Sequence, residues 1–108
     1  MQIYKIHITH VWAFIISSTR SYLYVQNIIN KTFLKALGER IRELRLRKNM
    51  TQEELGFEVG NSGKQIGRIE RGENNVTSCM LFQISKALKI EMKELFDFKI
   101  PEKKKKSN

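Results

Sequence analysis

Residues 51–72, TQEELGFEVGNSGKQIGRIERG, constrain the fold more than any other stretch of this 108-residue chain. Thr51 can cap a helix, and Glu54, three residues later, completes the pattern of a capping box. Gly60 stands where a left-handed residue ends a helix, a conformation that glycine adopts without steric cost. Ser62 can then cap a second helix. The stretch therefore predicts two short helices joined by a tight turn.

The second of these helices has two chemically different faces. Its inward side carries Ile66, Ile69 and Glu70. Its other side carries small and basic residues, namely Gly63, Lys64, Gly67, Arg68 and Arg71. A helix with one apolar face and an opposite face of small, cationic, hydrogen-bonding residues suits a nucleic-acid groove. This pattern predicts DNA binding.

A further helix is predicted over residues 34–49, before the pair. Its apolar residues recur at helical spacing and form one stripe: Leu34, Leu37, Ile41 and Leu44. After the pair, Thr77 can cap a helix over residues 78–88. A short helix over residues 91–96 would return Leu95 and Phe96 to the core. The sequence thus predicts an all-α domain of five helices.

The distribution of charge along the chain is more informative than its net charge of +9. Residues 1–36 carry four bases and no acid, residues 37–100 carry twelve bases and ten acids, and the end of the chain holds Lys103–Lys106. Because the helical part is nearly balanced, DNA affinity must come from where its charges lie. Residues 99–108 are interpreted as a basic tail.

Cysteine and hydropathy exclude several classes of protein. The single cysteine, Cys79, rules out an intramolecular disulfide and a Cys-rich metal site. Its place in an apolar helical run predicts a small buried hydrophobe. The longest apolar run, Val11–Ile16, is far shorter than the roughly 18 residues of a membrane helix. A reducing cytoplasm is the expected compartment, and no cofactor is predicted.

Residues 1–33 are a different kind of sequence, rich in strand-favouring residues. We weigh three hypotheses for this extension: a β-rich arm that pairs across a dimer, a flexible extension, or upstream sequence included by a wrongly chosen start. His7 and His10 lack a third ligand nearby, so no metal site is predicted.

The motif resembles the helix-turn-helix of phage-repressor-type (Cro/CI, XRE) regulators. The shared pattern is T-Q-E-E-L, a small residue, Gly60, Ser62 and I-x-R-I-E-R-G, and the similarity runs without gaps from about Leu37 to Phe96. The resemblance implies a five-helix, lambda-repressor-like domain over residues 34–98 that binds double-stranded DNA.

Near the end of the domain, the sequence departs from that family at two places. Lys89 stands where a glycine usually ends the fourth helix, and Glu91 stands where serine or aspartate usually caps the fifth. Gly56 replaces the usual alanine, and we expect it to let the two motif helices nearly touch. Gly67 is expected to face outward, so that the helix backbone can approach the groove.

The resemblance also implies roles for single residues, because such domains lay the second motif helix in the major groove. The candidates for reading bases are Gly63, Lys64, Gln65 and Arg68. The candidates for contacting phosphates are Gln52, Arg71, Asn74 and Asn75. In the family, the glutamine matching Gln52 also braces the first reading residue. Since that residue is Gly63 here, only the phosphate role carries over.

Arg45 and Glu70 are predicted to form a structural ion pair. In the family, an arginine matching Arg45 pairs with a glutamate matching Glu70. The residues agree with this reading, because Glu70 falls on the inward side of its helix and a buried carboxylate requires a cation.

The expected function is sequence-specific DNA binding by a transcriptional regulator, most simply a repressor. We expect a homodimer built from the last helix region, with two reading helices about 34 Å apart on an inverted repeat. One alternative is an antitoxin that neutralises a toxin partner and regulates its own gene. Another is a restriction–modification controller protein. No catalytic set of residues is evident, so an enzyme is not expected.

Overall fold

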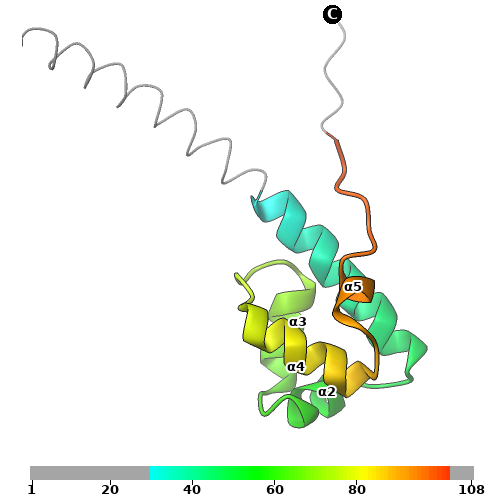
Figure 1. The fold of residues 1–108 in the computed structure, drawn as a ribbon. Helices are drawn as coiled ribbons and strands as arrows, with labels where there is room; N and C mark the ends of the chain where they lie inside the picture. Colours follow the sequence, from blue (N-terminus) through cyan, green and yellow to red (C-terminus); the bar gives the residue numbers. More distant parts are fainter. Residues whose placement is uncertain (1–29, 103–108) are drawn as a thin grey trace, which may run out of the picture. The chain divides into compact units, whose positions relative to one another are not determined.

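The computed structural model describes residues 30–102, and within this range the chain is helical, without strands. The first helix covers residues 30–47 and is followed by four more (Figure 1). These are α2 (Gln52–Glu58), α3 (Gly63–Glu70), α4 (Ser78–Leu88) and α5 (Met92–Leu95). The all-α prediction is confirmed. The hypotheses for residues 1–29, including His7 and His10, lie outside the described residues, as does the lysine run 103–106.

The first helix already includes residues 30–33, ahead of the predicted start at Leu34. The ring of Phe33 lies 5.8 Å from the ring of Phe98, centroid to centroid. This contact gives the early turn of the helix an apolar partner from the far end of the domain. The packing of Phe33 against Phe98 therefore makes this turn part of the helical domain.

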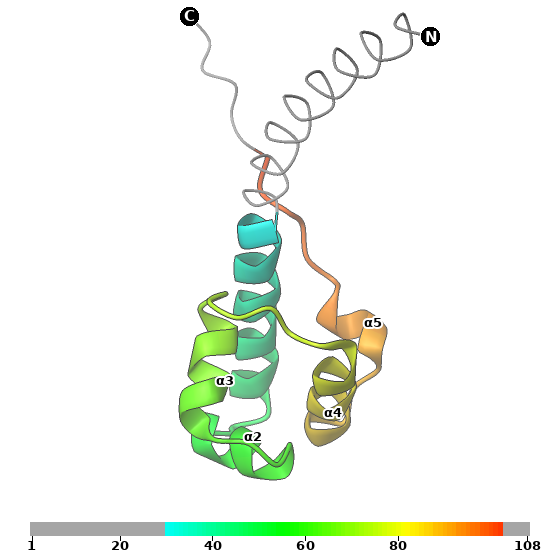
Figure 2. The same ribbon diagram turned by 90° about the vertical axis from the view of Figure 1, so that its left-hand side faces the viewer.

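One hydrophobic core joins all five helices. It contains Leu37, Ile41 and Leu44, then Leu55, Val59, Ile66 and Ile69, then Leu81, Ile84, Leu88 and Leu95. In Figure 2, α3 lies to the left of the first helix, α2 lies at its lower end, and α4 and α5 lie to its right. In addition, α2 contacts both α3 and α4. The motif is therefore anchored to the rest of the domain through its apolar side.

Side chains cap three helices as the sequence predicted. The Thr51 hydroxyl accepts from the Glu54 amide at 3.1 Å, and the Glu54 carboxylate accepts from the Thr51 amide at 2.9 Å. Ser62 caps α3 and Thr77 caps α4 in the same way. Each cap satisfies backbone donors that the helix itself leaves without partners. The element boundaries of the motif are thus set locally.

The end of the domain shows the two departures noted in the sequence. Lys89 adopts a left-handed conformation, with φ of 56°, at the end of α4. Glu91 precedes α5 without a side-chain cap. The prediction that Phe96 returns to the core is wrong, because its exposed fraction is 42%. Leu95 fills the buried position of the single-turn helix, so the next residue points away.

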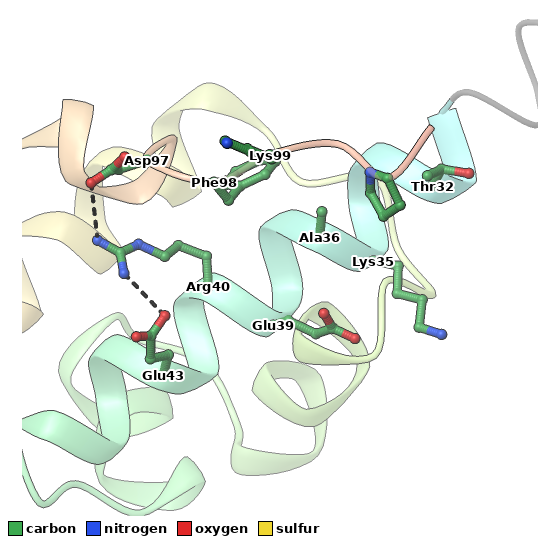
Figure 3. A pocket seen from close by; sticks show the side chains of 10 residues that line it. Thr32, Lys35, Ala36, Glu39, Arg40, Glu43, Asp97, Phe98 and Lys99 are labelled. Atoms are coloured by element: carbon green, nitrogen blue, oxygen red, sulfur yellow. Dashed lines mark hydrogen bonds and ion pairs between the residues drawn. The ribbon is translucent and has the colours of Figure 1, made fainter. Parts of the chain in front are cut away.

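Arg40 ties the C-terminal segment to the first helix (Figure 3). Its Nε donates to the carbonyl oxygen of Glu94 at 2.9 Å, and its Nη1 donates to Glu43 at 3.0 Å. Its Nη2 lies 3.9 Å from the carboxylate of Asp97. These contacts border a hollow of about 620 Å³ between the first helix and residues 97–101.

The prediction that Cys79 is buried is wrong, since its side chain is exposed. The inward face of α4 consists of Leu81, Ile84 and Leu88. Cys79 lies instead on the outer face, with Phe82. No helix within residues 30–102 is long and apolar enough to cross a membrane.

Candidate nucleic-acid interface

The turn between α2 and α3 is closed by its own backbone. Gly60 has a left-handed φ of 71°. The amide of Gly60 donates to the carbonyl of Phe57 at 3.1 Å, and the amide of Asn61 donates to the carbonyl of Gly56 at 2.7 Å. This pair of bonds is the Schellman arrangement that glycine makes possible. The predicted helix-turn-helix geometry is therefore present.

Two glycines allow α2 and α3 to approach closely. A Cβ atom on Gly56 would lie 2.6 Å from the carbonyl carbon of Ser62. One on Gly63 would lie 2.8 Å from Cγ of Glu53. The expectation for Gly56 is confirmed. Gly63 has a packing role that the sequence did not indicate, because its free side faces α2.

The expectation that Gly67 faces outward is wrong, because Gly67 is buried. A Cβ atom there would lie 3.1 Å from Nη1 of Arg71 and 3.3 Å from Oε1 of Gln52. The two long side chains reach over Gly67 from α2 and from the end of α3. Gly67 is thus covered by two of the residues that were predicted to contact phosphates.

A buried polar network fixes the orientation of α3. Arg45 Nε donates to Glu70 Oε1 at 2.6 Å, and Arg45 Nη2 donates to Glu70 Oε2 at 3.1 Å. The remaining Nη1 of Arg45 donates to the carbonyl of Met50 at 2.7 Å. Within the described range, no buried side-chain nitrogen or oxygen lacks a hydrogen-bond partner. The network therefore supplies the partners that a buried charge requires.

Gln52 belongs to the same network. Its Nε2 donates to Glu70 Oε2 at 2.9 Å, so α2 is linked to the pair that joins the first helix to α3. The sequence-based view that Gln52 has lost its bracing partner overlooked this bond. A signal was present, because a carboxylate has more acceptor sites than one arginine fills.

The candidate base-reading side chains stand on the open side of α3. Lys64 and Arg68 are exposed, and Gln65 is half-buried. Neither Lys64 nor Arg68 makes an ion pair with any residue in the described range. Their charges are one turn apart on a helix whose other face is buried. This arrangement offers two cationic donors to a groove.

Arg71, at the end of α3, has a partner that the sequence analysis missed. Its Nε and Nη2 donate to the two carboxylate oxygens of Glu73, at 2.8 and 3.3 Å. The hydrogen bond from Arg71 lowers the pKa of the Glu73 carboxyl, and the same contact raises the pKa of Arg71. Asn74 is half-buried and Asn75 is exposed in the loop that follows. Only the charge pattern around Gly72 could have indicated this pair.

Comparison with known proteins places these features in a family. A family model described as helix-turn-helix matches residues 41–95, about half of the chain. Control protein C.BamHI of Bacillus amyloliquefaciens is 45% identical over 62 residues, which are 56% of this chain and 76% of that protein. An HTH-type transcriptional regulator of Sinorhizobium fredii, y4wC, is 43% identical over 61 residues, 56% of this chain but only 43% of that protein.

Solved structures give the same result. The restriction-modification controller protein C.AhdI of Aeromonas hydrophila is 41% identical with a TM-score of 0.57, over 58% of this chain and 96% of that one. The clp gene regulator ClgR of C. glutamicum is 28% identical with a TM-score of 0.58, over 59% and 83%. The motif, its caps and these relatives lead to one conclusion: the chain belongs to the helix-turn-helix family of DNA-binding transcriptional regulators.

Proposed function

We propose that this chain is a homodimeric regulator of the restriction–modification controller type, which reads an inverted repeat in duplex DNA. The observation that carries the proposal is the exposed cationic side of α3, held in place by the buried Arg45–Glu70–Gln52 network. Two relatives, C.BamHI and C.AhdI, carry the name of controller proteins. They favour a controller over the antitoxin hypothesis.

In the proposed complex, α3 lies in the major groove. Lys64 donates to guanine O6 and N7, a pattern that lysine side chains match. Gln65 and Arg68 are the further base-reading residues. The phosphate contacts come from Gln52, Arg71, Asn74 and Asn75, which set the register of the protein on the duplex.

The dimer follows from the size of the module, because one short reading helix supplies little specificity alone. Exposed apolar side chains at the end of the domain support a contact between two copies. Phe82 on α4 has an exposed fraction of 52%, and Phe96 after α5 has one of 42%. We place this regulator in the cytoplasm with its DNA, assign it no catalytic step, and expect it to repress.

The central test is the binding of Lys64→Ala to a duplex selected from random DNA, measured by fluorescence anisotropy. We expect specific binding to weaken by about 1–3 kcal/mol while binding to random duplex barely changes. Lys48→Ala is the matched control, because Lys48 is exposed and lies after the first helix, outside α3 and outside the proposed dimer contact. Equal losses on both duplexes would assign Lys64 to phosphate instead of bases.

A second measurement tests the dimer and the sign of regulation. Analytical ultracentrifugation of the complex should give two chains per selected site, and one chain per site would contradict the homodimer. A reporter gene placed behind the selected site should lose expression when the chain is present. Increased expression would replace the repressor proposal with an activator.

A further inference from the structure

Glu73 is held in a defined place at the end of α3. Gly72 is left-handed, with φ of 73°. Its amide donates to the Ile69 carbonyl, and the Glu73 amide donates to the Arg68 carbonyl, both at 3.0 Å. A Cβ atom on Gly72 would lie 2.7 Å from Cα of Lys35, so the turn also packs against the first helix. The Glu73 backbone is therefore fixed over the last turn of α3.

The Glu73 side chain binds Arg71 at two points. The distances are 2.8 Å from Arg71 Nε to Glu73 Oε1 and 3.3 Å from Arg71 Nη2 to Glu73 Oε2. A guanidinium binds two oxygens of a DNA phosphate with the same paired geometry. The carboxylate thus occupies the donors that a phosphate would use.

Helix stability does not explain this carboxylate. The side chains of Arg71 and Glu73 are 59% and 51% exposed, and exposed ion pairs add little to stability. A negative charge near the C-terminus of a helix also faces the negative end of the helix dipole. The charge of Arg68 is close enough to lower the pKa of the Glu73 carboxyl as well. Glu73 therefore offsets positive charge on the face proposed to meet DNA.

We infer that Glu73 determines specificity by competing with DNA phosphate for Arg71. The inference rests on the proposed DNA-binding role of α3. On random DNA the protein docks loosely, Arg71 stays paired with Glu73, and its phosphate contact is not made. On the correct site, full entry of α3 brings a phosphate against the guanidinium and displaces the carboxylate. Arg71 then strengthens only the closely docked complex.

The test is Glu73→Gln, which keeps the shape and removes the charge. Affinities for the selected site and for random duplex are measured by anisotropy between about 50 and 200 mM salt. We expect the affinity for random duplex to rise about two- to fivefold, the range for an exposed ion pair. The salt dependence on random DNA should steepen by about one phosphate contact. The selected site should gain less, so the specificity ratio falls.

Two controls separate competition from plain repulsion. In an Arg71→Gln background, Glu73→Gln should give no further gain, because the competed donor is gone. Glu58→Gln removes another exposed carboxylate, on α2, and should leave the specificity ratio unchanged. Thermal melting of each variant checks that the fold is intact.

Other results overturn the inference in distinct ways. A gain that persists without Arg71, or an equal gain from Glu58→Gln, would mean general repulsion of DNA by carboxylates. Weaker binding by Glu73→Gln would mean that Glu73 positions Arg71 for phosphate. Each of these results leaves the proposed function intact, provided that the wild-type chain binds its selected site. Failure of the wild-type chain to bind any duplex at low salt would overturn both proposals.

Discussion

Two arginine–glutamate pairs lie at the end of α3, and they differ in surroundings more than in chemistry. Arg45–Glu70 and Arg71–Glu73 are both two-point contacts. The side chains of the first pair are 7% and 3% exposed, and those of the second are 59% and 51% exposed. Glu70 and Arg71 are neighbours in sequence, yet each is bound to a different partner.

The difference shows how burial decides what an ion pair can do. The inner pair has further partners in Met50 and Gln52, and the Arg45 and Glu70 side chains are themselves shielded from water. The outer pair is exposed, so water can replace either partner at small cost and a phosphate can replace Glu73 beside Arg71. The inner pair therefore sets the position of α3, and the outer pair is available for regulation of binding.

The largest expected effect comes from breaking the inner pair. Arg45→Met leaves Glu70 as an unpaired buried charge, and we expect the free energy of unfolding to fall by about 3–5 kcal/mol. The measurement is urea denaturation. Arg45→Met with Glu70→Leu should recover most of the loss, since an apolar pair replaces the ionic one. A stable Arg45→Met variant would contradict the assigned role of the pair.

The next effect tests the link from α2. Gln52→Ala removes a hydrogen bond to a buried carboxylate, and we expect a loss of about 1.5 kcal/mol in the free energy of unfolding. Gln65→Ala is the matched control, because Gln65 is also half-buried but lies on the reading side of α3. It should change stability by less than about 0.5 kcal/mol. Equal losses in the free energy of unfolding for the two variants would show that the Gln52–Glu70 hydrogen bond does not stabilise the fold more than another half-buried side chain does.

The outer pair should have almost no effect on stability. Arg71→Gln and Glu73→Gln are expected to melt at the same temperature as the wild-type chain, since both side chains are solvated. Differential scanning calorimetry provides the measurement. A clear drop in Tm for either variant would show that the outer pair also stabilises the fold, as the inner pair does.

The smallest effect is a dependence on pH. The hydrogen bond from Arg71 lowers the pKa of the Glu73 carboxyl from its ordinary value of 4.5. A carboxyl with a lowered folded-state pKa adds stability above its ordinary pKa, and that stability is lost as pH falls through the folded-state pKa. Carbon-detected NMR titration should show that Arg71→Gln raises this pKa back toward 4.5. An unchanged pKa would mean that the contact does not persist in solution.

The helix caps and the turn between α2 and α3 were predictable from the sequence. Thr51 and Ser62 cap their helices, and Gly60 is left-handed, because each of these features depends only on three or four neighbouring residues. The outward placement of Lys64 and Arg68 agrees with helical spacing in the same way. Phe96 and Cys79 were misplaced, because helical periodicity does not decide which apolar side chain finds space in a shared core.

The sequence by itself determined where the helices of the motif begin and end, which face of α3 is apolar, and which family the chain resembles. These properties follow from local hydrogen bonding and from the period of the helix. Only the tertiary structure decided that Gln52 of α2 binds Glu70 and that it reaches over Gly67 of α3. Such contacts depend on the reach of long side chains between elements, and the helical period carries no information about that reach.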